Sequence, residues 1–486
     1  MKVRNALLHA GLGAAMVLLS GCGVGTGDTV LASGGLTGTG ITQGTITSFG
    51  SIHVNGTRYV TDGATFERDG SVADITAFEV GEIVTLRWTL DDDGITRNAS
   101  LVFYDTEIRG VVTGVPDLVN NTVEVLGQTV QVTGTTAFHG TSITGLADIA
   151  QGDYVELNAF QQSYDPAAPI PLRATEIEVI TPAATVSNPV DVELKGVVDA
   201  TGPGTVDIGA ITVHWLAVPD GTPAVGDYIK VEGSYSNTTP NRIDDATVRD
   251  ARRGIELDAD EEDEAELEGV VTSLTSPDEF EVNGQPVVTA PDVTYEPAGL
   301  VLAVGGRVEV EGTINALGIL VADSIEARDE GDIEIEANVE NIDADNQSVT
   351  VLGIEVFTND LTQFDDDSDL ELQYFDFADI GIGDHLVIRA LEDSITDQVR
   401  ATRVERQNAT SEIALEGTVE SKTDPSTITI LGVDIDVASP TITSRQDEND
   451  AELTSTAFYD AVTVDQTVVG VSGDAGGWTD LEIESP

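Results

Sequence analysis

Residues 122–132 read TVEVLGQTVQV, and apolar and polar side chains alternate on both sides of Leu126-Gly127. An alternation with a period of two is typical of a β-strand with one buried face, and a central glycine allows a tight turn. The stretch therefore predicts a β-hairpin. Asn55-Gly56 and Asn283-Gly284 give the same signal elsewhere, because a type I′ turn needs two residues with positive φ.

This hairpin belongs to a longer pattern that recurs about every 70 to 80 residues, so the chain contains internal repeats. A Gly-x-Val opening precedes each hairpin, and a Val-Gly-Asp step and an Ala-Thr-x-Ile-Glu segment follow it. The turn glycines are Gly56, Gly127, Gly209, Gly284, Gly353 and Gly432, and the openings begin at Gly44, Gly110, Gly196, Gly269, Ala337 and Gly417. The sixth copy departs from the pattern, because Val464-Asp465-Gln466 replaces the Val-Gly-Asp step.

Each copy holds about five short strands and no convincing amphipathic helix, which predicts an all-β protein. Five strands leave two open edges unless the sheet curls shut. We therefore expect a tandem array of about six small antiparallel five-stranded β-barrels, OB-like in strand count, in preference to two-layer sandwiches. Tyr59, Phe66, Trp88 and Tyr104 are expected to fill the core of the first copy.

The predicted domains are residues 44–108, 109–180, 192–250, 266–328, 332–406 and 412–486. A Pro/Ala/Thr-rich linker, residues 181–191, separates the second and third copies. The acidic run at residues 258–264 precedes the fourth copy and should be solvated and extended. These connections predict independent domains joined like beads on a string.

The first 22 residues, MKVRNALLHAGLGAAMVLLSGC, are typical of a signal peptide. Lys2 and Arg4 precede an apolar stretch, and Leu19, Ser20, Gly21 and Cys22 resemble the bacterial lipobox. The resemblance implies cleavage before Cys22 and lipidation of its thiol, which would anchor the chain stably in a membrane. Gly23 after the cysteine favours the outer membrane by analogy, with the face left open, and residues 23–43 read as a flexible tether.

The charge balance limits the partners. The chain has 22 Lys and Arg against 86 Asp and Glu, a formal net charge of −64. Such a field repels phosphate backbones, so we expect no nucleic-acid partner. Cys22 is the single cysteine, which excludes an intrachain disulfide and a cysteine-based zinc site. The expected contacts are the membrane, through the lipid anchor, and an unidentified envelope or extracellular partner.

Phe49-Gly-Ser-Ile-His-Val-Asn-Gly56, the Val-Gly-Asp step and the Ala-Thr-x-Ile-Glu segment resemble the bacterial family called domain of unknown function 5666. Members of that family are often lipoproteins with several tandem copies. The resemblance implies a β-rich fold and export from the cytoplasm. It supplies no activity and no catalytic residues.

The sequence gives little sign of catalysis. His53, His139, His214 and His385 fall in four different copies at different landmarks, which favours ordinary core or surface histidines over one site. No nucleophile elbow, zinc-protease motif or phosphate loop is present. We therefore predict no catalytic residues and no enzymatic activity.

Two acidic clusters are the candidate metal ligands, and calcium is the candidate cofactor. They are Asp91, Asp92 and Asp93, and Asp365, Asp366, Asp367 and Asp369. Calcium takes six to eight oxygen ligands, which Asp-rich loops can supply. Neither run has the glycine and terminal glutamate of a calcium loop, so solvated turns are the simpler interpretation.

The sequence thus predicts a non-enzymatic, lipid-anchored cell-envelope protein that presents tandem β-modules for structural or interaction roles. One alternative is a periplasmic lipoprotein that binds a ligand or a cation in its acidic loops. A weaker alternative is a polysaccharide-binding accessory protein, which rows of exposed aromatic side chains would support.

Overall fold

The alternating stretch at residues 122–132 forms the predicted hairpin. β9 (Thr122–Val125) pairs antiparallel with β10 (Gln128–Gln131), and Leu126 and Gly127 between them have φ values of 46° and 69°. Asn55 and Gly56 have φ values of 54° and 79° in the first repeat. Two successive positive φ values are what a type I′ turn requires, so the predicted turn chemistry is confirmed.

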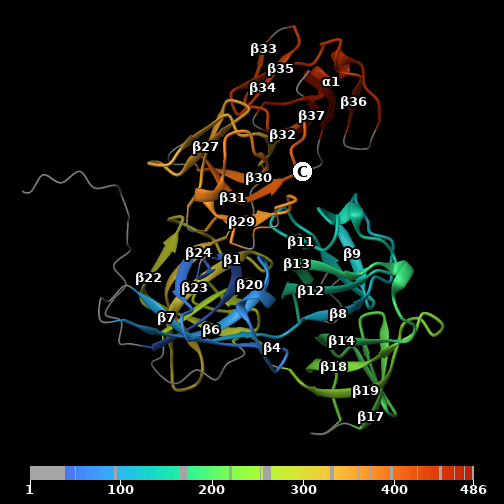
Figure 1. Cartoon of the computed structure of the whole chain (residues 1–486). Helices are drawn as coiled ribbons and strands as arrows, with labels where there is room; N and C mark the ends of the chain where they lie inside the picture. The colour runs from blue at the N-terminus through green and yellow to red at the C-terminus, as the bar shows by residue number, and fades with distance from the viewer. Residues whose placement is uncertain are drawn as a thin grey trace, which may run out of the picture. The chain divides into compact units, whose positions relative to one another are not determined.

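The computed structural model describes residues 39–483 except 50, 92–95, 165–171, 218–221, 252, 256–263, 329–332, 360, 371, 373, 394–397, 424, 448–450, 465 and 475–476. Within these residues the protein is nearly all β, as predicted (Figure 1). None of the described helices is long and apolar enough to cross a membrane.

The first repeat closes into a barrel. Its elements are β1 (Thr39–Phe49), β2 (Ile52–Val54), β3 (Thr57–Val60), β4 (Thr65–Arg68), β5 (Ser71–Ala73), the 3₁₀ turn η1 (Ile75–Ala77), β6 (Ile83–Leu90) and β7 (Arg97–Tyr104). β1 pairs with β2 and β6, β2 pairs with β3, and β7 pairs with β3 and β6. The ring β1-β2-β3-β7-β6 therefore has no open edge, which confirms the five-stranded barrel.

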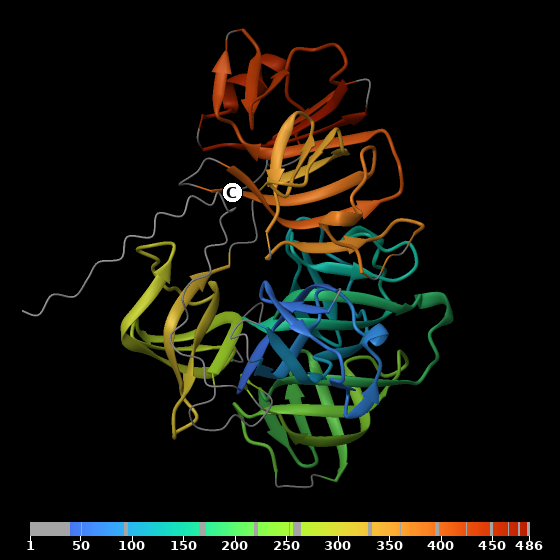
Figure 2. The ribbon, with the colours of Figure 1, turned by 60° about the vertical axis from the view of Figure 1, so that its left-hand side comes forward.

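The fourth repeat shows the same ring without additions, and Figure 2 shows its curled sheet in yellow-green and yellow. Its strands are β20 (Glu264–Ser276), β21 (Glu279–Val282), β22 (Gln285–Glu296), β23 (Arg307–Ile314) and β24 (Leu320–Ala327). β20 pairs with β21 and β23, and β24 pairs with β22 and β23. The contact between the third and fifth strands is parallel in both barrels.

The second and third repeats follow the same strand order. The second has β8 (Ile108–Val111), β9, β10, β11 (Ala137–His139), η2 (Leu146–Asp148), β12 (Tyr154–Gln161) and β13 (Leu172–Thr181). After η3 (Ala183–Thr185), the third has β14 (Val190–Val197), β15 (Ala200–Gly202), β16 (Thr205–Ile208), β17 (Ile211–Ala217), β18 (Tyr228–Tyr235) and β19 (Arg242–Asp250). A bridge between Val112, the residue after β8, and Val125 of β9 connects the start of the second repeat to its hairpin.

The fifth repeat has β25 (Ile333–Asn338), β26 (Asn341–Asp343), β27 (Ser348–Val351), β28 (Ile354–Phe357), β29 (Gln363–Asp366), η4 (Phe377–Asp379), β30 (His385–Asp393) and β31 (Gln398–Gln407). The sixth has β32 (Glu412–Thr418), β33 (Ser421–Thr423), β34 (Thr427–Ile430), β35 (Val433–Asp436), β36 (Ser444–Gln446), α1 (Ser455–Ala461), β37 (Val468–Asp474) and β38 (Gly477–Ile483). The expectation of no helix was wrong for α1, which Thr454 caps and whose Phe458 is buried. This helix lies in the copy whose sequence departs from the pattern.

The opening glycine is explained by the hairpin turn that packs on it. A Cβ atom added to Gly110 would lie 2.4 Å from the side chain of Leu126, and one added to Gly196 would lie 2.4 Å from Ile208. Real Cβ contacts are never this short, so a residue in or directly before the hairpin turn occupies the space of the missing side chain. The opening glycine and the hairpin turn, which are two separate landmarks of the sequence pattern, therefore pack against each other.

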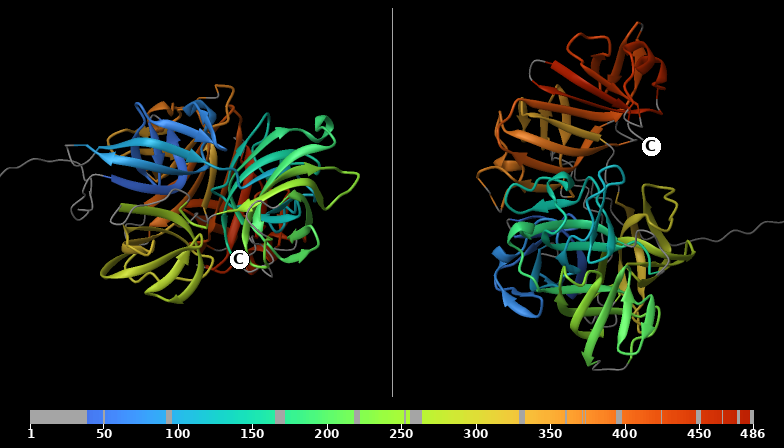
Figure 3. Two further views of the ribbon diagram at one scale, coloured as in Figure 1. Left: turned by 90° about the horizontal axis from the view of Figure 1, so that it is seen from below. Right: turned by 90° about the vertical axis from the view of Figure 1, so that its right-hand side faces the viewer.

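The expectation of independent domains was wrong, because the opening strands of different repeats pair with one another. β8 pairs antiparallel with β14, β25 pairs antiparallel with β32, and β1 pairs parallel with β20. These pairings join the second repeat to the third, the fifth to the sixth and the first to the fourth. Figures 1 and 3 show the orange fifth repeat continuing into the red sixth and the blue first repeat beside the yellow-green fourth.

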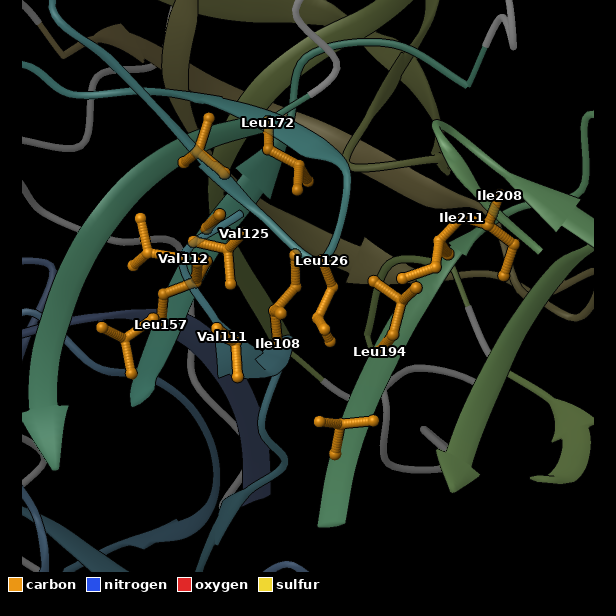
Figure 4. Packing of buried hydrophobic residues seen from close by; sticks show 14 of the residues in the cluster. Ile108, Val111, Val112, Val125, Leu126, Leu157, Leu172, Leu194, Ile208 and Ile211 are labelled. Carbon is orange, nitrogen blue, oxygen red and sulfur yellow. The ribbon is translucent and has the colours of Figure 1, made fainter. Parts of the chain in front are cut away.

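The joined repeats also share apolar packing. Figure 4 shows Leu194 and Ile211 of the third repeat in one cluster with Ile108 and Leu126 of the second. A single cluster likewise spans the fifth and sixth repeats, and Ile41 of β1 packs in the core of the fourth. All described residues belong to one compact unit, Thr37–Pro486. The predicted domain boundaries stay predictions.

Candidate functional site

Several predicted site residues lie outside the described residues. They are the lipidation position and the residues of its cleavage motif, Cys22, Leu19, Ser20 and Gly21, together with Asp92 and Asp93. Asp91 is exposed, and its backbone N–H donates to the carbonyl of Thr96 at 2.8 Å. This bond joins the residue after β6 to the residue before β7.

The second acidic run does not form the solvated loop that was the simpler prediction. Asp365 and Asp366 end β29 and are 9% and 8% exposed. Asp366 accepts hydrogen bonds from Nε and Nη2 of Arg406 at 2.8 and 2.5 Å, a bidentate ion pair. Asp369 is exposed and accepts from Asn408 at 3.3 Å. The carboxylates of this run therefore do not share one site, because neighbouring side chains on a strand point to opposite faces.

Asp365 and Asp367 instead converge with His139, which lies at the end of β11 in the second repeat. One ligand atom from each of the three side chains lies within 4.8 Å of the other two. Nε2 of His139 is 2.8 Å from the carbonyl oxygen of Val80, and Nδ1 is 3.3 Å from Oε2 of Glu79. A ring N–H donated to Val80 leaves the lone pair on Nδ1, so the imidazole is oriented as a metal ligand would be.

The electrostatics of this cluster favour an added positive charge. Burial and the Asp365 carboxylate raise the pKa of Asp367 to about 9, so the two acids resist being ionised together. Although burial opposes it, the carboxylates of Asp365 and Glu79 raise the pKa of His139. Oδ2 of Asp367 is buried and has no hydrogen-bond partner. A buried, unpartnered carboxylate oxygen is costly unless something else binds it.

A second ionic cluster lies between the third repeat and the short segment that joins β7 of the first repeat to β8 of the second. The amino groups of Lys195 and Lys230 both contact Asp105, and Lys230 also contacts Glu193. These lysines are 4% and 5% exposed. Although burial opposes the effect, Lys195 and Lys230 lower the pKa of Asp105. The two lysine ammonium groups already pair with these carboxylates. The cluster therefore stabilises the contact between the segments and leaves no carboxylate free to bind a metal ion.

A third cluster joins the first repeat to the second. Glu156 of β12, which is 3% exposed, accepts from Arg68 and from Nε of Arg109 at 2.5 Å. Arg109 also donates to Asp69 at 2.6 Å. Burial raises the pKa of Glu82, which pairs with Arg68 at 2.5 Å, to about 8. Acidic and basic side chains from distant parts of the chain are therefore used to hold repeats together.

A cavity of about 250 Å³ lies among residues of the first, fourth and fifth repeats and Thr135 of the second. Its charged lining residues are Glu268, Glu296, Glu326, Glu392, Arg307, Arg328 and Arg400. Asn55 and Gln363, 6% and 4% exposed, also line it, and each has a side-chain oxygen without a hydrogen-bond partner. The cavity can hold a small polar molecule that both donates and accepts hydrogen bonds.

The aromatic residues of the first repeat are core residues, as predicted. Tyr59 and Tyr104 are completely buried, and Phe66 and Trp88 are 9% and 4% exposed. Among the large hydrophobic side chains exposed in the described part of the chain, Tyr374 is the aromatic one. The described residues therefore hold no row of exposed aromatic side chains of the kind that would support polysaccharide binding.

The convergence of His139 with Asp365 could not be read from the sequence. The residues lie 226 positions apart, in two repeats and at different landmarks of the pattern. The one available signal was the density of carboxylates in the run from Asp365 to Asp369. That signal pointed to Asp365 and Asp367 and gave no indication of the histidine.

Comparison with known proteins agrees with the repeat architecture. The model of a family described as a domain of unknown function (DUF5666) matches residues 43–101, 109–178, 268–326 and 336–405, more than half of the chain. No curated protein matches. The third repeat, outside these matches, has the same strand order as its neighbours. The chain therefore belongs to the DUF5666 family, with its domain repeated in tandem.

Proposed function

We propose that the chain is a lipid-anchored protein of the bacterial cell envelope that acts by binding and display rather than by catalysis. The lipobox-like residues Leu19, Ser20, Gly21 and Cys22 support the anchor. The observation that carries the display role is the pairing of opening strands, which joins the repeats into shared sheets. Each pair of repeats joined in this way presents a continuous sheet to a partner.

The use of the charged residues supports a structural role. Glu156, Asp105 and Glu268 accept ion pairs that link one segment of the chain to another. Ionisable groups committed to such contacts are held in place by buried partners. These carboxylates are therefore used in structural ion pairs, whereas the acidic groups of a catalytic site must be free to contact a substrate.

Mass spectrometry of the protein purified from its native membrane tests the anchor. The mature chain should begin at Cys22 with acyl chains on that residue, and a Cys22→Ser variant should lose them and leave the membrane fraction. An unmodified thiol at Cys22 in the mature protein would contradict the proposal.

The cavity favours a second candidate function, the binding of a small neutral sugar or polyol. Hydroxyl groups both donate and accept, which matches a lining of arginines, glutamates and the unpartnered oxygens of Asn55 and Gln363. Glucose and N-acetylglucosamine should raise the unfolding temperature of the wild-type protein. They should do so less for Gln363→Leu, and no shift with either sugar in the wild-type protein would rule out this candidate.

A further inference from the structure

We propose that His139, Asp365 and Asp367 bind a divalent transition-metal ion, of which Zn²⁺ is the best match, and that the ion links the second and fifth repeats. The site goes beyond the display role and does not depend on the lipid anchor. Its three ligand atoms lie within 4.8 Å of one another without any rearrangement of the chain. Ligands about 2 Å from one zinc ion lie about 3–4 Å apart, so a small adjustment completes the site.

The donor set decides which metal fits. One imidazole nitrogen and two carboxylates suit zinc and its neighbours, whereas calcium takes six to eight oxygens. Glu79, whose Oε2 lies 3.3 Å from Nδ1 of His139, is placed to supply a fourth ligand. The proposed site differs from the candidate calcium site on the acidic run, because it has fewer ligands and includes a nitrogen.

The residues around the site orient its ligands. The carbonyl of Val80 accepts from Nε2 of His139 at 2.8 Å, which leaves the lone pair of Nδ1 available to an ion. Nη2 of Arg403 donates to Oδ2 of Asp365 at 3.1 Å, and the backbone N–H of Asp366 donates to Oδ1 at 3.0 Å. Outer partners of this kind fix the geometry of metal ligands.

One oxygen of the ligand cluster is available to a bound ion. Oδ2 of Asp367 is buried without a hydrogen-bond partner, although it belongs to the ligand cluster. Arg403 does not satisfy this oxygen, because its guanidinium group donates to Thr136, Asp365 and Glu405.

Isothermal titration of the full chain, purified in mild detergent and treated with a chelator, tests the proposal. ZnCl₂ should bind with one equivalent at this site, and CaCl₂ should not compete for it. His139→Gln and Asp367→Asn should each weaken zinc binding by more than about 100-fold, because losing a ligand costs at least as much as losing an outer partner. His214→Gln and Asp369→Asn are matched controls that should bind zinc as the wild type does.

Two further measurements separate loss of the site from loss of the fold. Zinc should raise the unfolding temperature of the wild type and of both controls but not of Asp367→Asn, whose amide is nearly isosteric with the carboxylate. Co²⁺ in place of zinc should give visible absorption without a thiolate charge-transfer band, because the single cysteine is Cys22. No zinc binding, wild-type affinity in His139→Gln, or equal competition by calcium would overturn the proposal.

Discussion

At the residue scale, the repeat pattern follows from a few positions at which the backbone conformation or the close packing permits few residue types. Asn55-Gly56 and Leu126-Gly127 need positive φ, and the opening glycine must leave room for the turn residue. The turns could be predicted because local conformation alone requires glycine there. The reason for the opening glycine could not be predicted, because it depends on a contact with a residue 11 to 16 positions away.

Replacing Gly110 by alanine should destabilise the protein by about 1–3 kcal/mol, because the new methyl group would overlap Leu126. Chemical denaturation measures the change. Gly145→Ala is the matched control, because no atom lies within 4 Å of the Cβ position there. Equal stability of the two variants would show that the opening glycine has another role.

At the scale of elements, strand existence was predictable and strand partners between repeats were not. Period-two alternation gave the hairpins, and five strands per copy gave the closed barrel. Which opening strands would meet depends on how the outer faces of folded barrels fit. β1 meets β20 more than 200 residues further on, and no local pattern encodes that distance. For the same reason, the meeting of His139 with Asp365 was missed.

Leu194→Ala should reveal the junction between the second and third repeats. Leu194 is fully buried and lies opposite Ile108 across the pairing of β14 with β8. The truncated side chain should lower the free energy of unfolding by about 2–5 kcal/mol. It should also lower hydrogen-exchange protection in both repeats, because they share one core.

The control for that change is Leu216→Ala, since Leu216 is 77% exposed in the same repeat. It should alter the free energy of unfolding by less than about 0.5 kcal/mol. Loss of protection in the third repeat alone after Leu194→Ala would mean that the two repeats unfold independently.

At the scale of the whole molecule, the excess of acidic residues sets the pH dependence of stability. Burial raises the pKa of Glu266 and of Glu326 to about 7, and that of Glu82 to about 8. Between about pH 4.5 and 8 the folded chain therefore holds protons that the unfolded chain releases, and stability falls as pH rises. Although burial opposes the effect, hydrogen bonds and ion pairs lower the pKa of Asp69 and Asp366, whose contribution is lost in acid below about pH 4.

The protein should consequently be most stable near pH 5, and its denaturation midpoint should be lower at pH 8. Glu266→Gln should reduce this difference and stabilise the protein at pH 8 by about 1–3 kcal/mol. A glutamine can still accept from Asn55, which donates to Oε1 of Glu266 at 2.8 Å. Glu279→Gln, at an exposed position, is the control, and an unchanged pH profile for Glu266→Gln would contradict the prediction.

The central claim is that opening strands join the repeats, and a cysteine pair across one junction tests it most directly. Glu334 of β25 and Glu416 of β32 are Cα partners in an antiparallel ladder, at a separation that a disulfide can span. In a Cys22→Ser background, Glu334→Cys with Glu416→Cys should form an intramolecular disulfide on mild oxidation. Glu334→Cys with Glu412→Cys, which are out of register, should stay reduced. Failure of the in-register pair to oxidise, or oxidation only to dimers, would contradict the account.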